Sequence, residues 1–557
     1  MNYRLYPDSP NDLNDLRGTV FANRKYVPPN PRFDANVAEY DKLANMDKTV
    51  ELFDRFKDKR MGIIVDADQD GYCSASILYR YIKKHFHNIP SYYLHSSKAH
   101  GLSNDLPEIK DIDLLIIPDA GTSDTSRCQE LQDKGIEILI LDHHIPEREN
   151  PYAVIVNNQC CDYPNKELCG TGVTWQFLRA LDDKYGFDDA MNYLDAVAVA
   201  TVADITIVTG NENRTIIDYG LKNVTHPLFY ALAEKANTPI QSLTGYDCQF
   251  GIIPLMNALI RVGKQDEKEL LFKAMCCEYE YFNYKKRGTT EVIEESIYER
   301  VARLAVNAKA RQKKIKTSDT DVMLAQIERR KADGHKILVV NGTDTDEQMT
   351  GMLASALADR FNKPCLVLRK YKDEYYTGSG RNSKISSVEN LKPVLEETGL
   401  FDYVAGHNNA FGVKINRANV KQMIATMDIV LPDTVVENFA DFSMVADDLT
   451  FDLVARVVKQ VMPYVGTGFD TPEFIVNGIE VRRDMIKQMA AGTSIKITTD
   501  EDVDIVAFNL EEDDPVRQWY EWGEGNSVTI NVVGECGMNF WNGMMTAQLI
   551  VREWEIE

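Results

Sequence analysis

Hydrophobic and polar positions from about residue 60 to residue 205 follow two alternating patterns. Short runs are apolar throughout, and each is followed by a stretch in which apolar residues recur every three or four positions. The first pattern is typical of strands buried on both faces, and the second of amphipathic helices. Their alternation favours a parallel sheet with helices on both sides. The predicted strands are MGIIVDAD, DLLIIPDAG, IEILILDHH and YAVIVN.

The pattern changes three times after this first domain, to which we assign residues 1–265. Residues 266–335 are helical in pattern and rich in charge, which indicates a helical connector. Strand–helix alternation resumes at 336–430 and predicts a second, smaller α/β domain. Residues 431–557 begin with a helical lead-in and continue as short strands with turns between them. We expect an α/β protein with a small C-terminal barrel, for which an OB-fold is one option.

Length and composition add little to this picture. A chain of 557 residues is too long for one core, and 44% hydrophobic and 26% charged residues are ordinary for a globular protein. No apolar run reaches about 18 residues and no signal peptide is visible, so we expect a cytoplasmic protein without membrane spans. Only Cys160, Cys161 and Cys169 cluster among ten cysteines, without paired CxxC motifs, which argues against zinc and for reduced thiols.

The net charge of −23 argues weakly against a nucleic-acid partner, because such proteins usually present a basic surface. The local field decides, however, and acidic clusters that hold metal also inflate the formal charge. A basic run at 303–316 could follow a nucleic-acid backbone, although a solvated helix face explains it equally well.

Carboxylates follow three of the predicted strands, in VDADQD (65–70), PDAG (118–121) and LDHH (141–144). The carboxyl ends of parallel strands line one crevice, where we expect these side chains to converge. Unpaired carboxylates so close together would repel, and divalent cations remove that penalty. Oxygen ligands with imidazole suit Mn²⁺, and Mg²⁺ less well. The candidate residues are Asp66, Asp68, Asp70, Asp119, Asp142, His143 and His144.

Each motif alone also has a plain structural interpretation. The DxDxDG sequence could form a loop or a calcium-like turn, but Ile77 stands where an EF-hand loop carries its glutamate. LDHH could be a helix cap or a surface turn, and PDAG a turn. Their repeated placement at strand ends favours a joint metal site over these separate interpretations.

These segments, with ATVADI (200–205), resemble the four motifs of the DHH phosphoesterase family in order and spacing. The resemblance implies a two-metal centre with Asp68, Asp70, Asp119, His143 and Asp204 as ligands. It gives Asp66, Asp142 and His144 catalytic roles, as outer or direct ligands and as a contact to the scissile phosphate. GIIPLMNALIR (251–261) is similar to a degraded PRxNAxGR segment of RecJ-type members, which retains Asn257 and Arg261.

The second domain resembles the DHH-associated domain. TGSGRNS (377–383) is similar to its GSGRS segment, and AGHNNAFG (405–412) to its GGHxxAAG segment. Ala405 and Phe411 depart from that pattern, and Ala405 could narrow the approach to a phosphate. Ser379, Arg381 and His407 would bind substrate phosphates. A plain hairpin turn is the alternative explanation of GSGR.

The C-terminal segments at 464–474 and 539–551 resemble the OB-like domain of RecJ exonucleases. That resemblance implies degradation of single-stranded DNA from the 5′ end to mononucleotides, in repair, recombination or replication. It also implies two divalent ions, Mn²⁺ before Mg²⁺, a monomer, and a single-stranded-DNA-binding protein or a helicase as candidate partners. Aromatic residues available for base stacking include Phe508, Trp519, Tyr520, Trp522, Phe540 and Trp541, although most could serve barrel packing.

Three other functions remain open from the sequence. A DHH phosphodiesterase for short oligonucleotides or cyclic dinucleotides would share the chemistry, but such members usually end after the associated domain. An inactive RecJ relative serving as a replication scaffold would lack metal-binding positions that are present here. An inorganic pyrophosphatase fits the metal motifs but neither the length nor the C-terminal strands.

Overall fold

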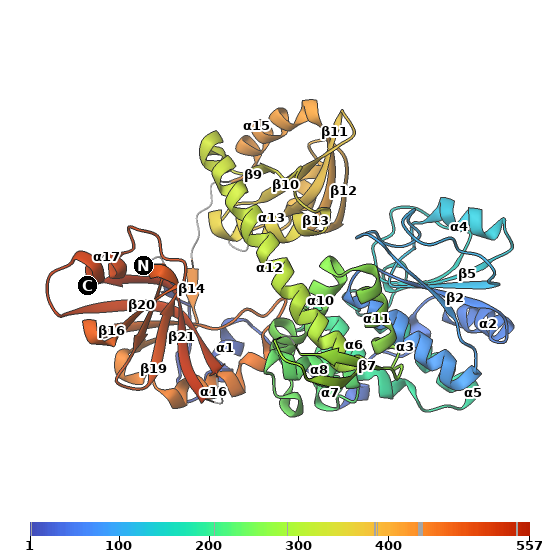
Figure 1. Cartoon of the computed structure of the whole chain (residues 1–557), viewed down its shortest axis with the longest axis horizontal. Coiled ribbons are helices and arrows are strands. Elements are labelled where there is room, and N and C mark those ends of the chain that lie inside the picture. Colours follow the sequence, from blue (N-terminus) through green and yellow to red (C-terminus); the bar gives the residue numbers. More distant parts are fainter. Residues whose placement is uncertain are drawn as a thin grey trace.

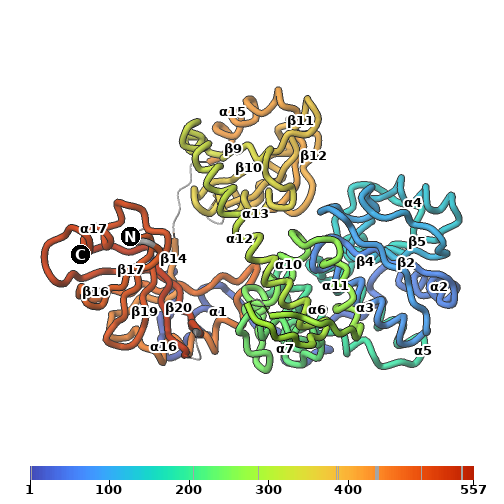
Figure 2. Tube along the Cα trace, viewed as in Figure 1, coloured from blue at the N-terminus to red at the C-terminus, as the bar shows by residue number. Residues whose placement is uncertain are grey.

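The computed structural model describes the chain except residues 2, 205, 287, 384, 385, 387, 433–437, 542 and 543. Figures 1 and 2 show three groups of elements, each built around a sheet of its own. One long helix, α12 (Ile297–Arg330), leads from the first group to the second. Among the described residues, no helix combines the length and the apolar character that a bilayer crossing needs.

The first group contains the predicted parallel sheet. Its strand order is β3-β2-β4-β5-β6, and all neighbours are parallel. The strands are β3 (Ser91–Leu94), β2 (Met61–Val65), β4 (Leu114–Pro118), β5 (Glu137–Asp142) and β6 (Val154–Asn157). Four of them occur where the hydrophobic runs predict strands, and β3 adds an edge strand that the pattern did not reveal.

Alternate residues of each strand enter two different cores, which explains why the strands are apolar throughout. Ile63 of β2 packs in the core that also contains α3 (Gln69–Phe86) and α5 (Gly170–Tyr185). Its neighbour Ile64 packs in the core that contains α4 (Thr125–Gln132) on the opposite face. The expectation of a sheet covered on both faces is therefore confirmed.

The chain continues from this sheet into a bundle of helices. The helices are α6 (Leu194–Ala203), α7 (Asn211–Lys222), α8 (Pro227–Ala236), α10 (Ile253–Val262) and α11 (Gln265–Met275). They share the core of α3 and α5, so the sheet and the bundle form one body.

The connector, residues 266–335, contains a β-hairpin as well as the predicted helices. A hairpin, β7 (Tyr281–Lys285) and β8 (Val292–Ser296), precedes α12. Glu295 on the hairpin accepts hydrogen bonds from Arg303 of α12, whose guanidinium lies 3.9 Å from the ring centre of Tyr284. These contacts from the helix stabilise strands that the local sequence does not distinguish from a helical continuation.

The second group is a mixed sheet of order β12-β13-β11-β10-β9. Its strands are β12 (Phe401–His407), β13 (Ala410–Asn416), β11 (Tyr375–Arg381), β10 (Cys365–Tyr371) and β9 (Leu338–Asn341). Helices α13 (Thr350–Phe361) and α15 (Val420–Val430) belong to its two separate cores. The segment 378–381 lies inside β11 and not in a hairpin turn, so that alternative is wrong.

The C-terminal group is a seven-stranded sheet of order β15-β16-β20-β21-β19-β18-β17. Helix α16 (Phe451–Gln460) packs on it, and β14 (Asn438–Ala440) precedes it. The strands are β15 (Phe442–Val445), β16 (Glu473–Arg482), β17 (Ile486–Met489), β18 (Ser494–Thr498), β19 (Val503–Ala507), β20 (Ser527–Trp541) and β21 (Met544–Ile556). The boundary expected near 430 falls next to residues 433–437, which lie outside the described part.

The beginning of the chain packs on the C-terminal sheet, which differs from the expected first domain of residues 1–265. Strand β1 (Tyr3–Leu5) pairs in parallel with β14, and helix α1 (Leu16–Asn23) contributes the fully buried Leu16 and Val20 to the C-terminal core. Both ends of the chain therefore lie in the same group of elements (Figure 1). The pairing joins residues more than four hundred positions apart, which no local pattern can reveal.

Candidate metal centre and active site

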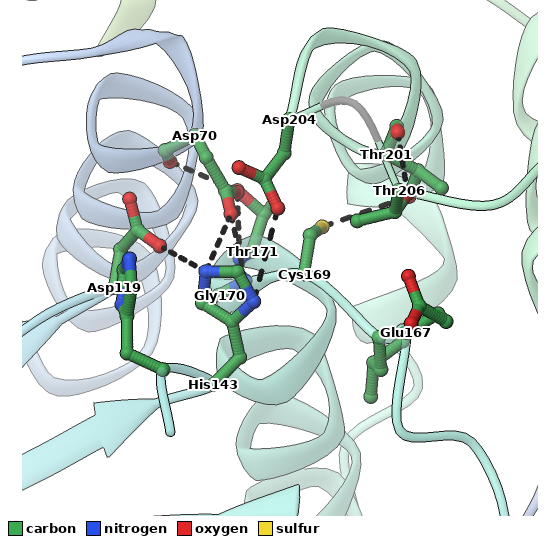
Figure 3. Close-up of polar contacts among 12 residues, drawn as sticks. Asp70, Asp119, His143, Glu167, Cys169, Gly170, Thr171, Thr201, Asp204 and Thr206 are labelled. Carbon is green, nitrogen blue, oxygen red and sulfur yellow. Dashed lines mark hydrogen bonds and ion pairs between the residues drawn. The ribbon is translucent and has the colours of Figure 1, made fainter. Parts of the chain in front are cut away.

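Three carboxylates surround the imidazole of His143 at the carboxyl edge of the parallel sheet (Figure 3). His143 Nε2 lies 3.3 Å from Asp119 Oδ1 and 3.9 Å from Asp70 Oδ2, and Nδ1 lies 3.7 Å from Asp204 Oδ2. Asp119 follows β4, His143 follows β5, and Asp70 lies in the first turn of α3. The fourth residue, Asp204, caps the C-terminus of α6.

Local backbone geometry brings Asp119 close to the start of α5. Asp119 has a left-handed backbone, with φ of 68°, and its N–H donates to Leu141 O at 2.7 Å. A Cβ at Gly170 would lie 2.2 Å from Asp119 Oδ1, so only glycine fits there. The N–H groups of Gly170 and Thr171 donate to the carboxylate of Asp70 at 2.7 and 2.8 Å. The N-terminus of α5 therefore holds Asp70 beside Asp119.

Buried polar atoms without partners mark this cluster as a cation site. Both carboxylate oxygens of Asp119, Oδ2 of Asp204 and Nε2 of His143 are buried and accept or donate no hydrogen bond. Such atoms are costly to bury, and a divalent cation would satisfy all of them. Carboxylate oxygens with one imidazole form a donor set that suits Mn²⁺ and Mg²⁺. The residues present therefore fit a divalent metal.

The pKa shifts have the same origin. Burial first, and then the neighbouring carboxylates, raise the pKa of Asp119 and of Asp204 well above the usual range. Burial, and then the charge of His144, lower the pKa of His143 to about 3. His143 is therefore neutral at physiological pH, which is the form that binds a metal.

Asp66 and Asp68, which share the first motif, have different surroundings. Asp66 is fully buried, and its oxygens accept the N–H of Gly101 at 2.8 Å and Nδ1 of His100. Asp68 caps α3, accepting the N–H of Gly71 at 3.0 Å. Burial would raise the pKa of Asp68, but the charge of His100 and the Gly71 N–H outweigh it and lower that pKa. Asp68 is thus ionised and available, whereas Asp66 is engaged.

Asp142 holds His144 rather than His143. Its Oδ1 accepts Nδ1 of His144 at 2.8 Å and the backbone N–H of His143 at 2.7 Å, and its Oδ2 accepts the N–H of Thr122 at 3.0 Å. Burial opposes the positive charge on His144, but Asp142 raises the pKa of His144 to about 10. One nitrogen of His144 lies within 4.8 Å of ligand atoms of Asp119 and His143. His144 therefore stands as a cation next to the cluster.

Three basic side chains from both α/β domains interact electrostatically with one another, and two of them also interact with Asp68. Lys98 comes from the loop after β3, Arg261 from α10 and Arg381 from the end of β11. Burial and then the charges of Arg261 and Arg381 lower the pKa of Lys98 to about 8, and Arg261 adds to burial in lowering the pKa of Arg381 to about 10. Cations that destabilise one another in this way form a site for an anion.

Two of the other predicted substrate-binding residues, Ser379 and His407, lie near Arg381. Ser379 Oγ is 2.9 Å from Thr350 Oγ1 at the start of α13, and a Cβ at Gly351 would lie 2.6 Å from the guanidinium of Arg381. His407 is the last residue of β12 and its side chain is exposed. Partial burial, followed by the charge of His144, lowers its pKa. Asn257 lies half-buried on α10, one turn before Arg261. No contact among the described residues brings Asn257 to the metal cluster.

The sequence interpretation missed Lys98 and His100. Both lie in the irregular segment between β3 and β4, in SSKAHGLS, which carries no motif that the hydrophobic pattern separates from an ordinary loop. Two residues of the basic run at 303–316 are already paired, Arg303 with Glu295 and Arg311 with Glu267. The run is therefore in part a face of α12 that carries ion pairs.

Carboxylates and imidazoles at the carboxyl edge of a parallel sheet, with cations from both α/β domains nearby, define a metal-dependent phosphoesterase of the DHH type. The model of the DHH family N-terminal domain matches residues 60–201, and that of the RecJ OB domain matches residues 440–553. Together with a relative that is 32% identical over the whole chain, these matches show that the chain belongs to the RecJ-type members of the DHH family.

One of the relatives matches this chain over its full length. A protein named as an SPbeta prophage-derived single-strand DNA-specific exonuclease, YorK of Bacillus subtilis (strain 168), is 32% identical and covers 100% of this chain and 98% of its own length. The single-stranded-DNA-specific exonuclease RecJ of Escherichia coli (strain K12) is 23% identical over 84% of each chain. The crystal structure of RecJ in complex with Mn²⁺ from Thermus thermophilus aligns with a TM-score of 0.71 at 19% identity, over 96% of this chain and 75% of that chain.

Proposed function

We propose that the protein hydrolyses single-stranded DNA from the 5′ end and releases mononucleotides, with two divalent ions of which Mn²⁺ is preferred. The observation that carries this proposal is the set of buried, unpartnered oxygens on Asp119 and Asp204 beside neutral His143. The names of the relatives, which describe single-strand-specific exonucleases, support the same substrate.

The residues that would hold the ions are the carboxylates and the imidazole at the sheet edge. They are Asp68, Asp70, Asp119, His143 and Asp204. A bound divalent cation supplies the Lewis acidity that activates water and neutralises charge on a phosphodiester. His144, held by Asp142 and kept positive, would contact the scissile phosphate or protonate the leaving oxygen.

The basic cluster would bind the 5′-terminal phosphate and so set the register of cleavage. Arg381 and Arg261 offer planar donors, Lys98 adds a point charge, and Ser379 adds a hydroxyl. His407, whose pKa burial and then the charge of His144 lower and whose surroundings include Arg381, would add a further donor. A terminal phosphate held at a fixed distance from the metal cluster would favour removal of one nucleotide at a time.

The C-terminal domain would guide the strand. Phe508 is 54% exposed, Trp522 78% and Phe540 53%, which suits base stacking, whereas Trp519 is 7% exposed and belongs to the core. The Trp541 side chain lies outside the described part. We further propose a monomer that works with a single-stranded-DNA-binding protein or a helicase.

A labelling experiment tests the proposal. We expect a 5′-labelled strand to release labelled mononucleotide in the first turnover with Mn²⁺, and a 3′-labelled strand to shorten gradually from full length. Asp119→Asn should abolish cleavage. The control Asp113→Asn changes the aspartate at the other end of β4, which pairs with Arg60 on the surface. Cleavage of dinucleotides alone would contradict the proposal and favour a short-oligonucleotide phosphodiesterase, and absence of all hydrolysis would favour an inactive scaffold.

A further inference from the structure

The loop between β3 and β4 is ordered by hydrogen bonds within the loop, and the carboxylate of Asp105 accepts most of them. Asp105 Oδ2 accepts the N–H of Ser97 at 2.7 Å and its hydroxyl at 2.8 Å. Asp105 Oδ1 accepts Nδ1 of His95 at 2.9 Å and the hydroxyl of Ser103. An irregular segment with so many internal hydrogen bonds holds a defined shape.

Two carboxylates, one at the end of β2 and one at the start of α4, anchor this loop at the active-site edge. Asp66, directly after β2, accepts the N–H of Gly101 at 2.8 Å, and Asp124, before α4, accepts the N–H of Leu102 at 2.7 Å. Gly101 has a φ of 62°, and a Cβ there would lie 2.2 Å from Asp124, so glycine is required. These anchors place the preceding residue, His100, directly over Asp66.

The orientation of the His100 ring follows from its contact with Asp66. Nδ1 of His100 is bound to Asp66 Oδ2, so its Nε2 points away from Asp66. The side chain is 47% exposed, which leaves Nε2 open to a ligand in the crevice. A nitrogen of His100 lies within 4.8 Å of carboxylate oxygens of both Asp66 and Asp68.

This arrangement repeats the pair formed by Asp142 and His144. Asp66 and Asp142 are each about 1% exposed or less, and each lies at the end of a strand. Each accepts a hydrogen bond from Nδ1 of a histidine whose side chain is nearly half exposed. The two strands, β2 and β5, lie on either side of β4, which carries Asp119. The two imidazoles are therefore held by the strands on either side of the one that leads to Asp119.

The charge of Asp66, and then that of Asp68, raise the pKa of His100, whereas burial and the charge of His144 lower it. Asp66 holds Nδ1 of the ring, so Nε2 is the nitrogen that remains for a contact beside Asp68. Both hydrogen bonds that Asp66 accepts come from the loop, from His100 and from Gly101, so Asp66 positions the His100 ring.

We propose that His100 is a further catalytic residue of this chain, which donates a hydrogen bond from Nε2 to a non-bridging oxygen of the scissile phosphate, opposite His144. The inference rests on the proposed hydrolysis of a phosphodiester. Lys98, two residues earlier in the same loop, faces Arg261 and Arg381 and would bind the terminal phosphate instead. The loop would thus contact two successive phosphates.

Single-turnover cleavage of a 5′-phosphorylated strand, with saturating Mn²⁺, tests this role. One donor to a developing charge contributes about 10²–10³-fold in rate, so we expect His100→Ala to slow cleavage by about that factor. His100→Gln, which keeps an amide donor and most of the volume, should recover part of the rate and serves as the test if the alanine variant fails to fold. His87→Asn is the control, because His87 is exposed and has a left-handed φ of 52° that asparagine adopts.

Three further readouts separate this role from its alternatives. The loss should be equal on strands with a 5′-phosphate and a 5′-hydroxyl, because His100 would not contact the terminal phosphate. A phosphorothioate at the scissile position should slow the wild type more than His100→Ala for one of the two stereoisomers. Titration of Mn²⁺ followed by electron paramagnetic resonance should give the same affinity in both proteins.

The proposal is overturned if His100→Ala cleaves at the wild-type rate, or if the variant loses Mn²⁺ affinity by tenfold or more, which would make His100 a metal ligand. A dinucleotide is assayed in parallel. If the wild type cuts only the dinucleotide, the proposed strand degradation fails, and the role of His100 is then decided on that substrate. A wild type that cuts neither substrate overturns both proposals.

Discussion

Replacing Asp204 by asparagine should have opposite effects on the protein without and with metal. Asp204 Oδ2 is buried without a partner, and one carboxylate oxygen each of Asp204 and Asp70 lie within 4.8 Å of each other. Asp204 is also the C-cap residue of α6, and the helix dipole disfavours negative charge at that end. Asparagine keeps the shape and removes the charge.

The distance sets the size of the effect. Two unit charges 4.8 Å apart at an effective dielectric constant of about 20 repel by about 3.5 kcal/mol. Because the pKa of Asp204 is raised well above its usual range, partial protonation reduces this cost near neutral pH. We therefore expect Asp204→Asn to stabilise the metal-free protein by about 1–3 kcal/mol.

The same variant should lose the stabilisation by metal. Mn²⁺ at a hundred times its dissociation constant stabilises the wild type by about 2.7 kcal/mol, or about 5–10 °C in Tm for a domain of about 150–250 residues. Thermal unfolding with chelator and with Mn²⁺ measures both effects. Asp188→Asn, an exposed aspartate of the same domain, is the control and should change neither.

The dependence on pH has a definite sign. A carboxyl group whose folded pKa is raised contributes stability below its unfolded pKa of about 3.9 and loses that contribution as the pH rises through the folded pKa. The advantage of Asp204→Asn without metal should thus be absent near pH 4 and grow toward pH 8. A variant that is less stable than the wild type at pH 8 without metal, or that still gains several degrees with Mn²⁺, would refute the reasoning.

Three other changes have defined outcomes. Arg381→Lys removes the planar pair of guanidinium donors, so KM for a 5′-phosphorylated strand should rise about 10–100-fold. KM for a 5′-hydroxyl strand should change little. An equal rise in KM for both strands would contradict a site for the terminal phosphate. Asp142→Asn removes the charge that raises the pKa of His144 to about 10. The alkaline limb of the pH–rate profile should therefore move to lower pH, and kcat should fall about 10²–10⁴-fold. If the alkaline limb does not move, His144 is not the group that causes it. Leu16→Ala opens a cavity in the C-terminal core and should cost about 2–5 kcal/mol in chemical unfolding, whereas the exposed Arg17→Ala should cost under about 0.5 kcal/mol; equal effects would show that α1 does not pack there.

Much of the architecture follows from local periodicity. The apolar runs at β2, β4, β5 and β6 have no polar alternation because their two faces enter two cores, and that property is visible in the sequence. Parallel strands place their carboxyl ends on one edge, so the meeting of Asp119, His143 and Asp70 could be expected without coordinates.

Other features depend on contacts between distant segments. The hairpin before α12 is held by arginines of that helix, and β1 pairs with a strand near the other end of the chain. The motif VDADQDG is a further example. The spacing of its three aspartates does not by itself show which of them bind metal and which hold a neighbouring residue.

The sequence alone therefore determined the order of the domains and which strand ends carry carboxylates and imidazoles, because both follow from spacing along the chain. Only the tertiary structure decided which of these aspartates and histidines are free to bind metal and which position a neighbouring residue. Asp66 is occupied by His100 and Gly101, while Asp119 and Asp204 keep buried oxygens without partners. Hydrogen-bond partners are set by loops that fold back from elsewhere, and burial decides which unpaired charges require a cation.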